Sequence, residues 1–141
     1  MSWQIWAAIS AVAAGVTSVF AKAGLEEVPA NLGNAVRTAI ILAITLGILA
    51  VSKEPASLSA LSTRTWLMLA LSGLATAASW VAFFHALAAG PATPVTAIDR
   101  ASLVVTMLLA FAFLDEPLGL RRAAGALLVV AGAVLASTAG R

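Results

Sequence analysis

The sequence predicts an all-α integral membrane protein whose five transmembrane helices form a single domain over residues 1–141. Composition is the first reason: 62% of the residues are hydrophobic, 10% are charged, and the mean hydropathy is +1.03. A soluble domain carries roughly 25% charged residues, so this chain has too little polar surface to cover a water-soluble globule. The second reason is pattern, because the apolar runs are too long for barrel strands and do not alternate. All loops between the runs are short.

The same composition excludes several function classes. The chain has no cysteine and one histidine, so it can build neither disulfides nor Cys or His metal clusters. Its net charge of +2 comes without any basic run, which argues against nucleic acid as a partner. The sequence lacks a nucleophile elbow, a phosphate loop and an HExxH motif. We therefore expect no enzyme and no cofactor, and we expect membrane lipid and a small-molecule substrate as partners.

The first helix is predicted at about residues 3–24. Residues 3–21 are uncharged, which is long enough for a span, and Lys22 follows them. A signal peptide is the competing interpretation. It is disfavoured because residues 1–4 hold no basic side chain and the apolar run exceeds the usual ~7–15 residues. Small residues recur at helical spacing towards Lys22 and offer a surface for close helix packing: Ala7, Ala11, Gly15 (or Ala14) and Ser18.

The second and third helices are predicted at about residues 32–52 and 65–89, with Asn31 as the cap of the second. The uncharged run of the second, residues 38–52, is fifteen residues long. Because a span needs about 20 residues, this short run draws Arg37 into the membrane. The third helix places four residues on one face, and His85 lies near its far end. These four are Gly73, Ala77, Trp80 and Phe84.

The fourth helix is predicted at about residues 94–114 and the fifth at about 119–138. In the fourth, residues 101–114 form an uncharged run of only fourteen, so Asp99 and Arg100 must lie below the membrane surface. Charges at that depth are costly and usually functional. Pro117 ends this helix because it cannot donate to a continuing one. The fifth helix carries another row of small residues: Gly132, Ala136 and Gly140.

All ionisable side chains predicted at membrane depth fall in the half opposite the N-terminus, when successive helices alternate in direction. We expect them to line a polar cavity, with Thr96, Asp99, Ser102 and Thr106 forming a stripe on the fourth helix. Structural alternatives stay open: Asp99 could pair with Arg37 or Arg100 only to hold helices together. The Lys22 side chain could extend to the membrane–water interface. His85 could lie at that interface, either solvated or capping a helix, and Trp80 could contribute only to helix packing. The predicted site comprises Asp99, Arg100, Arg37, Lys22, Trp80, His85, Thr96 and Ser102.

Loop charges predict the orientation. The side of the N-terminus carries four basic loop residues, whereas the other carries Arg141 and, if they are counted, the three membrane-depth cations. Cytoplasmic loops favour Lys and Arg, so we expect a cytoplasmic N-terminus. The bias is modest and is also compatible with insertion in both orientations. The four basic loop residues are Lys53, Arg64, Arg121 and Arg122.

The run HALAAGPATPVTAIDRASLVVTMLLAFAFLDEPLGLRRAAGALLVVAGAVL resembles the second half of an EamA domain, in the drug/metabolite transporter superfamily. Phe20-Ala21-Lys22 and Arg37 match its first half. The family's Leu-Gly-Glu at the end of the fourth helix reads Leu114-Asp115-Glu116 here, a departure that affects the turn. The resemblance implies one EamA-type inverted-repeat unit of five helices. Family members usually carry two such units and bind substrates between them.

The resemblance also implies a function. We expect a transporter in the bacterial cytoplasmic (inner) membrane that exports small polar metabolites, amino acids or drugs by alternating access. The alternative is a non-transporting membrane subunit, or a lipid-sugar flippase component that requires a partner chain. Because only one repeat is present, we expect an antiparallel homodimer, as in the small multidrug resistance proteins, or a heteromer with a paralogue.

Overall fold

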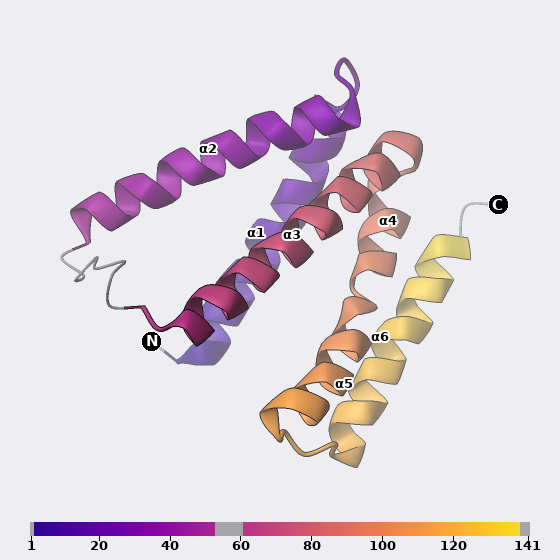
Figure 1. Ribbon diagram of the computed structural model, residues 1–141. Coiled ribbons are helices and arrows are strands. Elements are labelled where there is room, and N and C mark those ends of the chain that lie inside the picture. Colours follow the sequence, from indigo (N-terminus) through magenta and orange to yellow (C-terminus); the bar gives the residue numbers. More distant parts are fainter. Residues whose placement is uncertain (1, 53–60, 139–141) are drawn as a thin grey trace. The chain divides into compact units, whose positions relative to one another are not determined.

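A computed structural model describes residues 2–52 and 61–138, and all regular structure in these two ranges is helical (Figure 1). Five segments are long and apolar enough to cross a membrane, which confirms the predicted all-α, five-span fold class. Lys53, Glu54, Gly140 and Arg141 lie outside the described residues. The spans are α1 (Trp3–Gly24), α2 (Ala30–Val51), α3 (Thr63–Ala89), α4 (Ala92–Asp99) with α5 (Ser102–Leu114), and α6 (Leu120–Thr138).

Large apolar side chains are exposed along all five spans, from Trp3 and Phe20 on α1 to Leu135 on α6. Such a surface suits solvation by lipid chains and not by water. The chain divides into two compact units, which are described separately. Unit 1 combines Met1–Ala23 with Ala89–Arg141, and unit 2 is Gly24–Ala88.

In unit 2, α2 and α3 approach each other at Gly33. A Cβ atom added to Gly33 would lie 2.8 Å from Cδ2 of Leu25, the end of a flexible side chain, and at an ordinary contact distance of 3.5 Å from Cε1 of Phe84. Asn31 meets His85 and, further along α2, Arg37 meets Trp80. Because the residue number rises on α2 as it falls on α3, the facing halves of these helices run antiparallel.

The predicted cap of the second helix is wrong. Pro29, in extended conformation, occupies the cap position without a side-chain hydrogen bond. The Pro29 carbonyl accepts the first hydrogen bond of the helix, from the Gly33 N–H, at 3.0 Å. Proline has fixed φ and no N–H to lose, so it starts a helix readily. Asn31 is therefore the second residue of α2, and its side chain is hydrogen-bonded to His85 instead of capping the helix.

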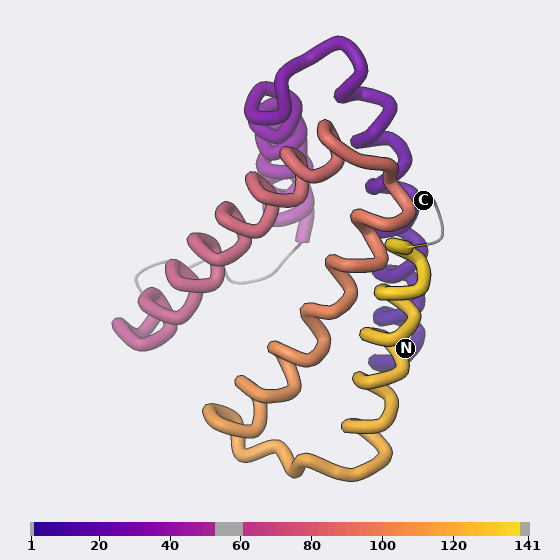
Figure 2. The backbone as a smooth tube through the Cα atoms, turned by 90° about the vertical axis from the view of Figure 1, so that its right-hand side faces the viewer, coloured from indigo at the N-terminus to yellow at the C-terminus, as the bar shows by residue number. Residues whose placement is uncertain are grey.

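In unit 1, α4 and α5 run beside α6, as both Figures 1 and 2 show. The buried face of α6 carries the small residues Ala126 and Ala133, which allow close backbone approach. Gly132, in the row of small residues noted in the sequence, is exposed, and a Cβ atom built on it would have no described atom within 4 Å. Two alanines seven residues apart therefore form the packed seam of this hairpin.

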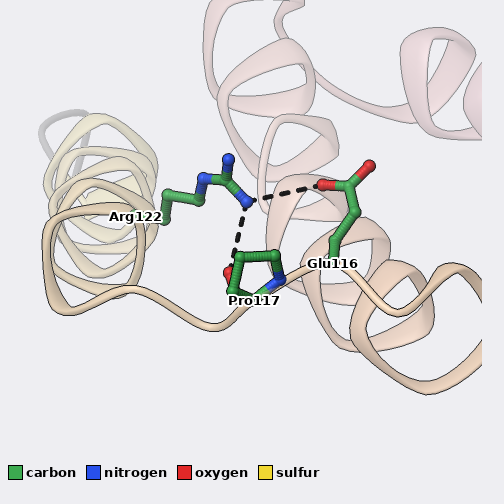
Figure 3. A network of polar contacts seen from close by, with 3 residues as sticks. All are labelled: Glu116, Pro117 and Arg122. Carbon is green, nitrogen blue, oxygen red and sulfur yellow. Dashed lines mark hydrogen bonds and ion pairs between the residues drawn. The ribbon is translucent and has the colours of Figure 1, made fainter.

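The turn between α5 and α6 explains the departure from the family's Leu-Gly-Glu. Asp115 ends α5 in the left-handed conformation (φ 55°), and Glu116 N–H donates to Ala110 O at 3.3 Å. Glycine is the usual residue at this position because it lacks a Cβ, and Asp tolerates the conformation better than most. Arg122 Nη1 then donates to Pro117 O at 3.2 Å and lies 3.6 Å from Glu116 Oε2 (Figure 3).

Candidate functional site

The fourth span is broken between α4 and α5. The N–H groups of Ala101, Leu103 and Val104 each donate to the carbonyl three residues back, at 2.9, 3.2 and 3.0 Å. The backbone dihedrals of Arg100 and Ala101 stay in the right-handed helical region, with ψ of −16° and −15°. The hydrogen bonds and angles are those of a tight 3₁₀ turn inserted in an α-helix, a feature that often marks a functional hinge.

This break lies at membrane depth. Arg100 is about 12 Å along the span from Ala92, at ~1.5 Å per residue, well inside a hydrocarbon core of ~30 Å. Irregular backbone at that depth is tolerated only where it is buried in protein or lines a water-filled cavity. The break therefore indicates that this part of the span is either buried in protein or lines a cavity, by an argument independent of the charges beside it.

The predicted polar stripe crosses this break. A 3₁₀ turn advances ~120° per residue against ~100° in an α-helix, so two such residues rotate the second half by about 40°. Thr96 and Asp99 are half-buried on α4, whereas Ser102 and Thr106 are exposed on α5. The Oγ1 atom of Thr96 is buried and lacks a hydrogen-bond partner among the described residues. The break thus divides the stripe into a half-buried part on α4 and an exposed part on α5.

In unit 2, the guanidinium of Arg37 lies over the indole of Trp80, with Cζ 3.4 Å from the ring centroid. The Phe84 ring is 5.8 Å from the same atom. Trp80 in turn meets Phe83 and Phe84 edge-to-face, at centroid distances of 5.4 and 6.1 Å. A cation over an indole face is stabilised by about 0.5–2 kcal/mol, the upper end applying where water is excluded.

Two asparagines that sequence reasoning left out of the site lie beside this stack. His85 Nε2 donates to Asn31 Oδ1 at 3.0 Å, since an amide oxygen can only accept. Asn34 Oδ1 is buried without a partner among the described residues. The spacing of Asn31, Asn34 and Arg37 by three residues places them along one side of α2, and this period was legible in the sequence.

The structure thus brings some predicted site residues together. Arg37 and Trp80 are in contact, and His85 is just over one turn from Trp80 on α3. The α4–α5 span holds Thr96, Asp99, Arg100 and Ser102, and Lys22 is half-buried in the last turn of α1. These two sets belong to different units, so the meeting of Arg37 with Asp99 stays a prediction.

Comparison with known proteins decides the family. The EamA-like transporter family matches residues 1–138. The chain belongs to this family. An uncharacterized transporter in the cobO 3′ region of a Sinorhizobium species is 42% identical over 134 residues, covering 95% of each chain. No solved structure matches.

The EamA assignment confirms the resemblance predicted from the sequence and makes this chain a multi-pass membrane transporter. The alignment with the Sinorhizobium relative covers 95% of each chain, so the two chains are of similar length. The family thus relates this chain to membrane transport. Among the described residues, no group of three or more His, Cys, Asp or Glu could hold a metal ion.

Proposed function

We propose that this EamA protein exports small polar metabolites, amino acids or drugs across a bacterial cytoplasmic membrane by alternating access, without a catalytic step. The observation that carries this proposal is the helix break at Arg100–Ala101, beside Asp99 and inside the fourth span. Discontinuous helices of this kind form the substrate and ion sites of many transporters. A span built only to anchor the chain would need neither the break nor the charges.

The two units supply different parts in this proposal. Asp99 and Arg100 bind ionic groups of the substrate or a coupling proton, and Thr96 and Ser102 add hydroxyl groups on either side of the break. The 3₁₀ turn absorbs the change in backbone angles when the cavity changes sides. In unit 2, Arg37 and Trp80 form a second binding surface, with His85 beside it. Lys22 adds positive charge at the end of α1.

We further propose that two chains assemble to complete the transport path. Family members usually carry two repeats, whereas this chain has one, and lipid cannot solvate Asp99, Arg37 or Arg100. An odd number of spans means that a copy must insert upside down to reproduce an inverted pair. An antiparallel homodimer meets this requirement, and a heteromer with an oppositely oriented paralogue meets it equally. The loop charges favour a cytoplasmic N-terminus for this chain.

Transport by the purified chain in proteoliposomes tests the proposal. The vesicles are loaded with a panel of amino acids and amphipathic drugs, and release is compared with Asp99→Asn and with protein-free vesicles. We expect release that needs Asp99. If the chain alone moves no solute but gains activity when a paralogue is co-reconstituted, the non-transporting subunit or flippase component is the better account.

A further inference from the structure

The orientation of the Arg37 side chain limits what it can bind. Its Cζ atom lies 3.4 Å from the Trp80 centroid. An edge-on guanidinium would bring a nitrogen nearest the ring and hold Cζ further away, so the group lies flat on the indole. One face of the guanidinium is then occupied, and its N–H bonds point outward around its edge.

That edge has no acceptor in the described part of unit 2. The acidic residues described there are Glu26 and Glu27, and neither forms an ion pair with Arg37. Among the described residues, the aromatic rings of Trp80 and Phe84 are the groups that the guanidinium meets. Donors that stay unpaired at membrane depth cost free energy, so an acceptor from elsewhere is favoured.

Asn34 gives a second, independent sign that a group is missing. It precedes Arg37 by three residues and so lies on the same side of α2. Its Oδ1 atom is buried without a donor among the described residues, although native structures pair nearly all such atoms. Asn34 Oδ1 requires a hydrogen-bond donor, which an oxyanion does not supply, so it marks a separate unfilled polar position one turn from Arg37 and not the anion itself.

We propose that the edge of Arg37 is an oxyanion site, which takes the carboxylate or phosphate of an amphipathic ligand whose apolar body packs against Trp80 and Phe83. A guanidinium fork matches two oxygens of such a group bidentately. Stacking on Trp80 holds the fork in place before the ligand arrives, which lowers the entropy lost on binding. This inference rests on the proposed transport function only in assigning the oxyanion to a substrate.

The oxyanion has two sources, a free carboxylate solute or an anionic lipid headgroup, and a binding assay separates them. Replacing Trp3, Trp6 and Trp66 by Phe leaves Trp80 as the sole indole in the chain. This protein is placed in phosphatidylcholine nanodiscs, and Trp80 emission is followed during titration with benzoate. Neutral benzamide is the matched ligand control, and nanodiscs with phosphatidylglycerol supply the lipid anion.

We expect a saturable change with one anion, absent with benzamide and weakened about tenfold or more by Arg37→Gln, the loss typical of a charge-assisted hydrogen bond. Arg37→Lys should restore binding only partly, because an ammonium cannot stack flat or bind as a fork. Arg64→Gln, which removes an exposed arginine at the start of α3, should change nothing.

Each outcome bears on the site itself. A benzoate response assigns the site to a solute, whereas a response to phosphatidylglycerol alone assigns it to a lipid headgroup. Responses to neither anion, or equal responses in Arg37→Gln, overturn the proposal. Binding is measured without a gradient, so a failure of transport in proteoliposomes would leave a positive binding result standing and would count against the proposed function alone.

Discussion

The guanidinium of Arg37 on α2 lies flat on the indole of Trp80 on α3, 3.4 Å from Cζ to the ring centroid. An arginine at membrane depth is usually expected to seek a carboxylate. Within unit 2 an aromatic face takes that place and stabilises the cation without neutralising it. The positive charge therefore stays available at the edge of the group.

A double-mutant cycle measures this contact. We expect Arg37→Met and Trp80→Leu to be coupled by about 0.5–2 kcal/mol in the free energy of unfolding, the range for cation–π pairs. Thermal or denaturant unfolding in detergent gives the four values. The matched cycle uses Arg64→Met and Trp66→Leu, which lie two residues apart on α3 and do not face each other. Equal coupling in both cycles would refute the stack.

The turn after α5 predicts a stabilising substitution. Asp115 holds φ at 55°, a conformation that is costly for residues with a Cβ. Asp115→Gly should raise the free energy of unfolding by up to about 1 kcal/mol, whereas Asp115→Val should lower it by more than that. Melting temperatures of the three proteins check the order. A valine variant as stable as the wild type would show that the turn is not left-handed.

Asp99 separates the transport site from a structural ion pair. Removing a carboxylate from mid-span saves about 2.5–3.5 kcal/mol on insertion scales, so Asp99→Asn should insert normally and lose transport. Expression level and solute release are measured on the same preparation. If Asp99→Asn instead abolishes expression and the added Arg37→Gln restores it, the two residues form a structural pair.

Assembly is tested by topology. Reporters fused after Arg141, one active only in the cytoplasm and one only outside, show on which side the C-terminus lies. The antiparallel homodimer predicts signal from both fusions. Signal from one alone would exclude that dimer and leave the heteromer with a paralogue.

The spans themselves could be predicted from the sequence because they depend on local properties, the length of each uncharged run against the thickness of the bilayer. The same argument put Arg37 and Asp99 at depth. It could not find the partner of Arg37, because which side chains of α2 and α3 face each other depends on how the two helices pack. Tertiary packing of this kind has no signal within either helix.

The break between α4 and α5 could not be predicted from the sequence for a different reason. Sharp kinks are usually attributed to Pro or Gly, and neither occurs between Val95 and Leu114. The break at Arg100–Ala101 is flanked by Asp99 and Ser102, whose side chains can bond nearby backbone groups and compete with the helical pattern. Asn31 failed as a cap for a related reason, since Pro29 starts α2 two residues earlier and leaves Asn31 Oδ1 for His85.

A polar cavity at membrane depth, around the break in the fourth span, is tested most directly by thiol labelling. The chain has no native cysteine, so Asp99→Cys and Leu109→Cys can each be labelled alone with a membrane-impermeant thiol reagent. Leu109 is an exposed apolar residue on α5 and serves as the lipid-facing control. The cavity predicts that Asp99→Cys reacts in intact vesicles while Leu109→Cys does not. Equal reactivity at the two positions would contradict it.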